Sequence, residues 1–592
     1  MQTIKNMKTV IKNILCVSAA ALMLSSCEGF LNLYPHDQNS SDSMFKSATL
    51  AESVVIGAYS NILYDYNSTD RSVLNWDSFA SVLDPSESIN YLDYNFLFGT
   101  LQPNNGMFSR YWKRMYEGVN RANDVIENIG RVPDMSDELK SQRIAECKFL
   151  RAYHYYRLNA LWRGVPIYKK NLAPNEYTLP RSTEEEVWNF IIEDCTACIE
   201  CKNLPKKASA NDHGRVTKGA AYTLRGKAYM WLKKYDLAQA DFEKVAECGY
   251  SLFNGNYADL FTEGNEKCNE MIFSAIMVEE SGNGNAFSNN YGNYCTTGYG
   301  KYQHYLNVNF INSFEEKSGK PFNWDNYIPG YSTTSVKARK AYFLRDGLTD
   351  SEKTKMTSSG ADMSLYLESG NEARVKAAYA NRDPRLAAIA ITPYSTYSGG
   401  ASGAAVTYTS RYPYRDWQSP SLDLRYGNNE YMFYPIRKFV TKGREYTNIG
   451  YNPVDVPIFR YADVLLSLAE ALNEQGKWSQ ALTYINMVRS RAGVVGINSA
   501  GYEGSEVAST EDLRPKIRNE KKWELACEEQ IYLEELRWGT WKDDKFAKDN
   551  GLQSVWGEAE YKYIWGGDAY LKWAVPQAEV EKAGLKQNDL WY

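Results

Sequence analysis

The sequence predicts a mostly α-helical fold, and two segments carry this prediction. In the later one, apolar residues recur at spacings of three and four positions and so share one helix face: Leu465, Leu468, Ala469 and Leu472. Gly476 ends that helix, and Ala481, Ile485 and Val488 repeat the spacing on a second one. The two helices are therefore expected to pack face to face.

A second segment repeats the pattern much earlier in the chain, at Gly226, Tyr229, Tyr235, Ala238, Phe242 and Val245. Arg225 stands where a leucine is usual. Small residues where helices approach closely, with large residues beside them, are typical of a tetratricopeptide unit. Because the two units are not in tandem, we expect the helical pairs to meet across long insertions. Insertions of that size usually carry function.

The first 26 residues have the pattern of a secretory signal peptide. Lys5, Lys8 and Lys12 precede an apolar run at 14–24 that is too short to span a membrane. The sequence Leu-Ser-Ser-Cys at 24–27 resembles a bacterial lipobox, so we expect cleavage before Cys27 and acylation of its thiol. Two or three acyl chains would anchor the protein stably. An ordinary signal peptide with a chance cysteine is the alternative.

We predict a lipidated tether at 27–43 and one helical domain at 44–592. Helical spacing predicts helices at 47–62, 111–129, 140–161, 183–203, 216–248, 461–491 and 514–536. Long stretches without that spacing are rich in Gly, Asn, Ser and aromatic residues, at about 65–108, 281–370 and 394–429. We expect these insertions to form a loop-rich layer that faces a ligand, and a short irregular tail to end the chain.

Composition narrows the classes of partner. The chain has 67 Lys and Arg against 72 Asp and Glu, a net charge of −5 without a basic run, which argues against nucleic acid as a partner. Aromatic residues make up 14%, including 46 Tyr and 15 Trp. Tyrosine and tryptophan combine an apolar face with a polar edge, which suits sugar rings or extended peptides. Large helical cores also consume tyrosine, so this interpretation has an alternative.

Metal and catalytic motifs do not emerge. Cys195, Cys198 and Cys201 are spaced by three, but they lie on a predicted helix without a fourth ligand nearby. We expect buried thiols or one local pairing there, with no metal and no cofactor. The 4 His are scattered, and neither a zinc-protease motif nor a nucleophile elbow is present. Carboxylates are plentiful, so a secreted glycoside hydrolase remains the less favoured alternative.

Short motifs in a defined order point to one family. They include Trp112 with Tyr116, Asn-Arg-Ala-Asn at 120–123, Gly-Val-Pro at 164–166, Asp-Pro-Arg-Leu at 383–386, Arg-Tyr-Ala-Asp-Val-Leu-Leu at 460–466, Val-Arg-Ser-Arg-Ala-Gly at 488–493, Asn519 with Glu520, and Glu524 with Leu525. Together they resemble the SusD/RagB family of Bacteroidetes outer-membrane nutrient-binding lipoproteins. The chain departs from the family where Glu-Glu-Gln-Ile at 528–531 stands in place of the usual Glu-Gly-x-Arg.

This resemblance implies a SusD-like fold, with tetratricopeptide-like helical pairs, on the cell surface at the outer membrane. It implies a SusC-like TonB-dependent transporter as partner, to which the protein delivers captured oligosaccharide without catalysing a reaction. A peptide-binding member of the family and a pure protein-interaction scaffold stay open as alternatives.

Aromatic and polar residues of two irregular regions are the candidate ligand contacts. The first region supplies Trp76, Asp77, Tyr91, Tyr94 and Asn95. The second supplies Asn290, Tyr291, Asn293, Tyr294, Tyr299 and Trp324. Both lie where the family tends to place parts of its site, and we expect Tyr94, Tyr291 and Trp324 to stack against sugar rings. No catalytic residue is predicted.

Overall fold

The computed structural model describes the chain from residue 41 onward, with gaps. The described residues are 41–63, 66, 76–86, 95–173, 175–280, 282–296, 304–400, 404–415, 422–425, 431–443, 445–446, 450–547 and 550–591. The predicted signal peptide, Cys27 and most of the tether lie outside them.

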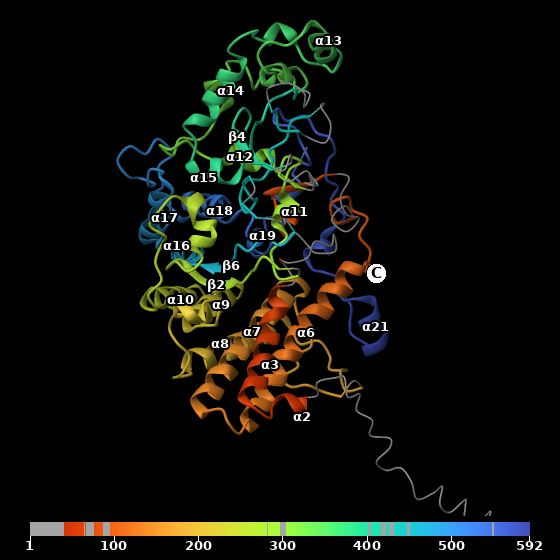
Figure 1. The fold of residues 1–592 in the computed structure, drawn as a ribbon, viewed down its shortest axis with the longest axis vertical. Helices are drawn as coiled ribbons and strands as arrows, with labels where there is room; N and C mark the ends of the chain where they lie inside the picture. Colours follow the sequence, from red (N-terminus) through yellow and green to blue (C-terminus); the bar gives the residue numbers. More distant parts are fainter. Residues whose placement is uncertain are drawn as a thin grey trace, which may run out of the picture.

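Long helices form the scaffold, and they occur where the sequence predicts them. They are α3 (Ala48–Leu63), α6 (Gly106–Asn128), α7 (Asp137–Trp162), α8 (Glu184–Glu200), α9 (Lys218–Trp231), α10 (Tyr235–Glu247), α16 (Tyr461–Glu474), α17 (Trp478–Ala492), α18 (Thr510–Leu525) and α19 (Ile531–Trp538). Successive helices from α6 to α10 pack against each other, and α16 packs against both α17 and α18. Figure 1 shows α3 and α6–α8 at the lower end and α16 and α17 along one side.

The two predicted helical pairs meet, as the pattern requires. Helix α10 of the first pair packs against α16 of the second. At the end of α16, Gln475 Nε2 donates to the Tyr235 carbonyl at 3.3 Å and to Gln239 Oε1 at 3.0 Å. The prediction that the pairs are brought together across the insertions is confirmed.

The unusual Arg225 has a partner of its own. Its guanidinium forms a bidentate ion pair with Asp241 on α10, in which Nε donates to Oδ2 at 2.8 Å and Nη2 donates to Oδ1 at 2.7 Å. On the same interface, a Cβ atom added to Gly226 would lie 2.6 Å from the Phe242 ring. An arginine is thus tolerated at the usual leucine position because the facing helix supplies a carboxylate, and glycine allows the two backbones to approach.

Short elements occupy the insertions between the scaffold helices. The first set is α2 (Ser41–Met44), α4 (Trp76–Phe79), β1 (Leu83–Pro85), η1 (Ile129–Arg131), η2 (Ala210–Asp212), η3 (Tyr257–Phe261), η4 (Glu263–Asn265), β2 (Met271–Ala275), α11 (Phe287–Tyr291), β3 (His304–Leu306) and α12 (Val308–Ser313). The second set is η5 (Trp324–Asn326), η6 (Ala338–Phe343), α13 (Asp350–Ser358), η7 (Met363–Leu365), α14 (Asn371–Ala380), α15 (Pro384–Ile389), β4 (Thr396–Gly399), β5 (Val406–Thr409) and β6 (Val456–Arg460).

The C-terminal tail differs from the prediction of an irregular segment. It contains α20 (Trp541–Lys545), η8 (Asp568–Leu571) and α21 (Gln577–Ala583). These elements are too short to show a full helical period in sequence, which is why the prediction missed them. Strands contribute little, because the described chain forms three antiparallel two-stranded sheets, β1–β3, β2–β6 and β4–β5.

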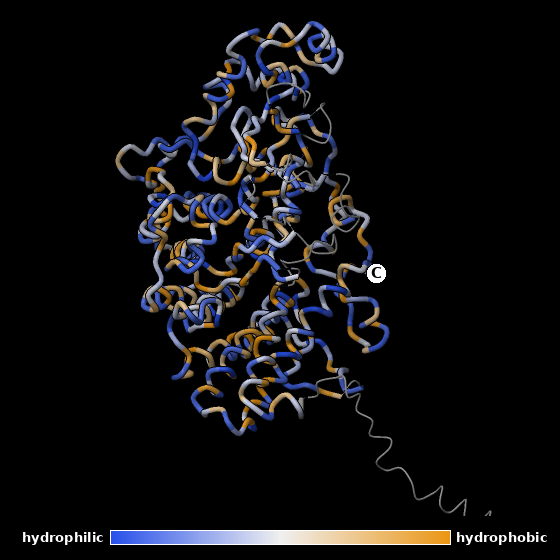
Figure 2. The backbone as a smooth tube through the Cα atoms, viewed as in Figure 1, coloured by the Kyte–Doolittle hydropathy of each residue, from blue (hydrophilic) through white to orange (hydrophobic). Residues whose placement is uncertain are grey.

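One apolar core runs through the molecule. The cluster of buried hydrophobic residues extends from Phe45 to Trp591 and includes side chains of both the scaffold and the insertions. Figure 2 shows apolar and polar segments interleaved along the whole tube. Among the described residues, no helix combines the length and apolarity needed to cross a membrane.

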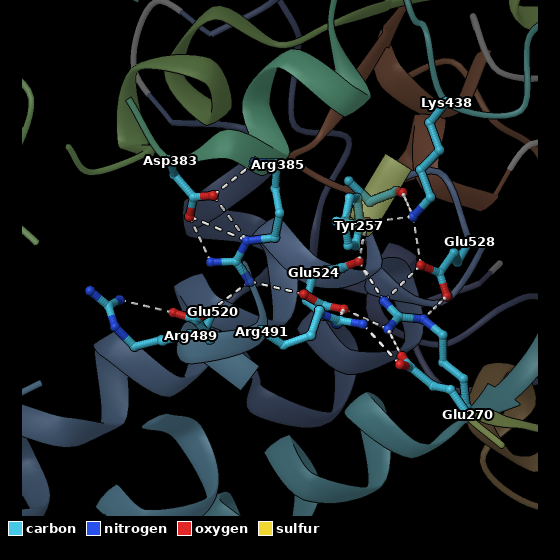
Figure 3. A network of polar contacts seen from close by, with 12 residues as sticks. Tyr257, Glu270, Asp383, Arg385, Lys438, Arg489, Arg491, Glu520, Glu524 and Glu528 are labelled. Atoms are coloured by element: carbon cyan, nitrogen blue, oxygen red, sulfur yellow. Dashed lines mark hydrogen bonds and ion pairs between the residues drawn. The ribbon is translucent and has the colours of Figure 1, made fainter. Parts of the chain in front are cut away.

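A network of buried charges crosses this core, drawn in Figure 3. Arg460, at the end of β6, is paired with Glu270 at 2.8 Å, Glu524 at 2.5 Å and Glu528 at 2.7 Å. All four of these side chains are fully buried. Lys438 pairs with the same Glu528 at 2.6 Å.

A second arginine extends the network to α15. Arg385 contacts Asp383 at 2.6 Å, Glu520 at 2.6 Å and Glu524 at 3.0 Å. On α17, Arg489 contacts Glu520 at 3.0 Å, and Arg491 contacts Glu524. Burial by itself would raise the pKa of the Glu524 carboxyl. The guanidinium groups of Arg491, Arg460 and Arg385 outweigh that effect and hold this pKa well below its usual range. The motifs at 383–386, 460–466 and 488–493 therefore meet in one structural centre.

We expect Gly226→Ala to destabilise the first helical pair, because its methyl group would collide with the Phe242 ring. The cost should be about 1–3 kcal/mol in urea unfolding, as for overpacking elsewhere. Gly57→Ala is the matched control, because nothing lies within 4 Å of its added Cβ. That helical substitution should stabilise by about 0.4–1 kcal/mol. Equal changes in unfolding free energy for the two variants would contradict the close approach of Gly226 to the Phe242 ring.

We also expect Arg460→Met to destabilise the protein by about 3–5 kcal/mol, because it leaves buried carboxylates without their counter-charge. Arg514→Met is the control, since Arg514 pairs with Glu474 at the surface and is 31% exposed. Removing that pair should cost about 1 kcal/mol or less. Urea unfolding of both variants measures the difference. A similar loss of unfolding free energy in the two would show that the buried network contributes no more to stability than a surface ion pair.

Candidate functional site

Strand pairing brings the two predicted site regions together. Strand β1 pairs with β3, with Asp84 opposite Tyr305. Asn307 reinforces the contact by donating from Nδ2 to Asp84 Oδ2 at 2.9 Å. Near the other end of the layer, the Ala286 amide donates to the Tyr66 carbonyl at 2.8 Å. The described parts of the two regions, residues 76–86, 282–296 and 304–307, thus lie against each other in one loop layer.

Asp77 lies at the base of this layer, in a buried pair with Glu529. The Asp77 amide donates to Glu529 Oε2 at 3.3 Å, and the Glu529 amide donates to Asp77 Oδ2 at 3.3 Å. The Tyr291 hydroxyl donates to the same glutamate. Burial raises the pKa of Asp77 to about 7 and the pKa of Glu529 to about 8, well above the usual range of carboxyl groups.

Most of the other predicted contacts lie in the interior. Trp76 is fully buried, with its ring stacked on Trp573 at 5.6 Å and the Arg157 guanidinium 4.5 Å from its centre. Trp324 packs elsewhere, on Tyr331 and Phe343, and is 7% exposed. Buried too are Asp77, Asn290, Tyr291 and Asn293. In this conformation these residues anchor the loops, and their faces are not open to a ligand.

Two predicted residues reach the surface. Tyr294 is 40% exposed, and Asn95 is half-buried with its side chain accepting a bond from Thr100 Oγ1 at 3.0 Å. Tyr91, Tyr94 and Tyr299 lie outside the described residues. Of the three predicted stacking residues, Tyr291 and Trp324 are therefore enclosed and Tyr94 is not described.

The structure adds a group of aromatic residues that the sequence prediction missed, here called the aromatic strip. Its half-buried members are Phe98, Phe546, Tyr561, Tyr563 and Trp565. Phe98 lies 5.2 Å from Tyr561, and Phe546 lies 4.9 Å from Trp565, measured between ring centres. The signal in the sequence is the alternation Tyr-Lys-Tyr-Ile-Trp at 561–565, which turns every second side chain to one side.

The strip is held firmly against the loop layer. The Tyr563 hydroxyl donates to Asp84 Oδ1 at 2.6 Å, and the Tyr561 hydroxyl donates to the Pro85 carbonyl. The Ile564 amide donates to the Leu97 carbonyl at 2.9 Å, two residues from Asn95. The rings are thus fixed against the layer as half-buried side chains, whereas Lys562 and Ile564 between them are exposed, and the strip adjoins the first predicted region.

Features of a catalytic or metal site are not seen in the part of the chain that the structure describes. No group of three or more His, Cys, Asp or Glu side chains there could hold a metal ion. Cys195 and Cys198 are buried free thiols on α8, and Cys201 follows them as a partly buried free thiol. Burial raises the pKa of Cys195 and Cys198, so they are not activated nucleophiles.

Comparison with known proteins agrees with this geometry. A family model described as "SusD family" matches residues 269–591, more than half of the chain. The chain belongs to the SusD family. A second model, described as "Starch-binding associating with outer membrane", matches residues 30–230 and supports association with the outer membrane.

Among its relatives, SusD-like protein P25 of Formosa agariphila is 24% identical over 558 residues, covering 89% of this chain and 90% of that protein. A solved SusD-like protein from Bacteroides fragilis shares 23% identity with a TM-score of 0.72, over 93% of this chain and 99% of the other. A laminarin-binding SusD-like protein shares 19% identity with a TM-score of 0.62, over 92% and 100%. The predicted helical SusD-like fold is confirmed.

The family departure at 528–531 now has a structural description. Glu529 occupies the position where the family usually has glycine, and its φ is 63°, in the left-handed region that glycine favours. A glutamate there costs about 1–2 kcal/mol of backbone strain. Its contacts with Asp77 and Tyr291 offset that cost and tie the loop layer to the segment after α18.

We expect the buried acid pair to make stability fall as pH rises. In the unfolded chain the pKa values of Asp77 and Glu529 are 3.8 and 4.5, whereas in the folded protein they are about 7 and about 8. The folded state thus binds more protons between about pH 4 and 8, and raising the pH through this window destabilises it.

Glu529→Gln should flatten that dependence and stabilise the protein by more than about 1 kcal/mol at pH 8. Urea unfolding at intervals from pH 5 to pH 9 measures the effect. Glu185→Gln, at an exposed position on α8, is the control and should leave the profile unchanged. A profile for Glu529→Gln as steep as that of the unsubstituted protein would refute the buried pair.

Proposed function

We propose that this protein is a non-catalytic glycan-binding lipoprotein of the cell surface, which captures oligosaccharides and delivers them to a SusC-like TonB-dependent transporter. The observation that carries the proposal is the aromatic strip on the loop layer of a SusD-family chain. Relatives of the same fold support it, since one solved structure is named as laminarin-binding and another as a surface glycan-binding protein.

The strip has the physical properties that sugar capture needs. The apolar face of a pyranose ring stacks on an aromatic ring, and the edges of the strip carry polar groups for hydroxyls. Lys542, whose side chain is exposed, has its Nζ 5.2 Å from the Trp565 ring centre, whereas the buried Lys545 packs its Nζ 4.5 Å from the Tyr563 ring centre and is bonded to Asp84. Because the tyrosine hydroxyls are already bonded within the protein, the rings are pre-organised and lose little freedom on binding.

Because several of the predicted ligand contacts are buried, fewer of them are proposed to touch the ligand directly. We propose Asn95, beside the strip, and exposed Tyr294 as contacts among the described residues. Tyr91, Tyr94 and Tyr299 remain proposals in the same layer. The buried residues Trp76, Asp77, Tyr291 and Trp324 would act indirectly, by holding the loops in place.

A binding role fits the carboxylates better than hydrolysis does. Glycoside hydrolysis needs two carboxyl groups that flank an accessible bond. The closest acid pair described above, Asp77 with Glu529, is enclosed in the core and bonded to backbone amides. Other buried carboxylates, such as Glu524 and Glu528, are held in ion pairs.

Membrane attachment and transfer complete the proposal. Acylation of Cys27 would anchor the chain in the outer membrane, and residues 27–43 would serve as its tether. Capture at the surface followed by transfer to a transporter requires a ligand held without chemical change, which is consistent with a rigid aromatic platform.

Trp565→Ala should weaken glycan binding by about 1 kcal/mol or more, roughly fivefold in Kd, because a stacking surface is lost. Isothermal titration against laminarin and starch oligosaccharides measures it. Tyr484→Ala is the matched control, since Tyr484 is also half-buried but lies on α17 of the scaffold. Thermal melting of each variant confirms that it is folded.

Other outcomes would favour the alternatives. Binding of peptides but of no member of a broad glycan panel would identify a peptide-binding relative. Release of new reducing ends during incubation with polysaccharide would identify an enzyme. Equal affinities for Trp565→Ala and the unsubstituted protein would remove the aromatic strip from the site.

A further inference from the structure

A groove separate from the aromatic strip lies between α15, η3 and the end of α17. Its volume is about 570 Å³, within the range of small-molecule sites. Small residues form its walls, including Ala258, Ala387, Ala388, Ala492 and Gly493. Thr396 and Asn256 add polar groups at its exposed rim. Because these side chains are short, the walls are flat, and a chain of ring-shaped units can lie against them.

Two cationic side chains line this groove without a carboxylate partner among the described residues. Arg437 donates only to neutral acceptors, the Thr396 carbonyl at 2.7 Å and the Ala390 carbonyl at 3.4 Å. Lys442 is exposed, and its Nζ has no hydrogen bond or ion pair within the described chain. Their positive charges are therefore not neutralised by the groove itself.

Arg491 also lines the groove. Its terminal nitrogens are paired with Glu270 and Glu524, and its side chain is 5% exposed. Its Nε atom has no hydrogen-bond partner, but it is buried within the protein. Figure 3 shows this arginine among the charged network, near Tyr257, which also lines the groove. The positive charge that a ligand in the groove can reach therefore comes from Arg437 and Lys442.

Besides the carboxylates paired with Arg491, an acidic residue of the described chain lies beside the groove. Glu445 lines a smaller hollow of about 60 Å³ that adjoins the groove and shares Arg437 and Lys442 with it. The Lys442 amide donates to the Glu445 carboxylate at 3.2 Å. Since Glu445 does not line the groove itself, the groove keeps a positive balance from Arg437 and Lys442.

We propose that this groove binds the carboxylate of an acidic sugar, a uronate residue within an oligosaccharide. The guanidinium of Arg437 and the ammonium of Lys442 match a carboxylate, and the flat alanine walls match the apolar side of a sugar ring. The proposal rests on the proposed function only in taking the ligand to be a glycan. It concerns a second site, on elements other than those that carry the strip.

Isothermal titration with a galacturonic acid tetramer tests it, with a galactose tetramer as the neutral ligand of equal length and sodium acetate as the free carboxylate. We expect the acidic tetramer to bind at least tenfold more tightly than the neutral one, and more weakly as salt concentration rises. Lys442→Glu and Arg437→Gln should each lower its affinity at least tenfold. Lys355→Gln, at an exposed position on α13, is the control and should have no effect.

Further comparisons separate this site from the strip. If Trp565→Ala abolishes binding of the acidic tetramer while Lys442→Glu does not, the acidic sugar binds at the strip, and the groove proposal fails although the proposed function stands. Equal binding of both tetramers, or acetate competing as well as the tetramer, would also overturn it. Thermal melting verifies that Arg437→Gln is folded, and Lys442→Glu alone suffices if it is not.

Discussion

The fold depends on the pairing of buried arginines with carboxylates from distant parts of the chain. Arg460 and Arg385 have no exposure to water, so each needs counter-charges in direct contact. Those charges come from the residue before β2, the N-cap residue of α15, α18 and the segment after α18. Satisfying them together aligns elements that simple apolar packing would leave free to shift. The network therefore determines how the insertions sit on the helical pairs.

This constraint explains why the family motifs say little about the ligand. Asp383, Arg460, Arg491, Glu520 and Glu524 all lie in the buried network, where they maintain the scaffold. In the function proposed above, recognition belongs to the aromatic strip and to the groove beside α15. The strip would offer aromatic rings, whereas the groove would offer the positive charges of Arg437 and Lys442. Two surfaces with such different chemistry would suit ligands that carry both neutral and acidic sugars.

Glu529 shows how the scaffold and the loop layer are joined. It adopts a left-handed backbone conformation next to Glu528 of the network, and its side chain reaches Asp77 and Tyr291 of the loop layer. Burial raises the pKa of both acids, so this pair lacks the arginine counter-charge found in the network. Ionising the pair at higher pH therefore lowers the stability of the folded protein.

The sequence by itself determined the helices and the family, because spacings of three and four residues report which face of a helix is buried and because the motifs occur in a fixed order. It could not determine which loop aromatics face a ligand. Trp76, Tyr291 and Trp324 are of residue types that bind sugars, yet they fill the interior, while Tyr561, Tyr563 and Trp565 of the C-terminal tail are only half-buried. Only tertiary packing decides this, since an aromatic ring in an irregular segment gains free energy from burial against the core or against a sugar, and no local periodicity distinguishes the two.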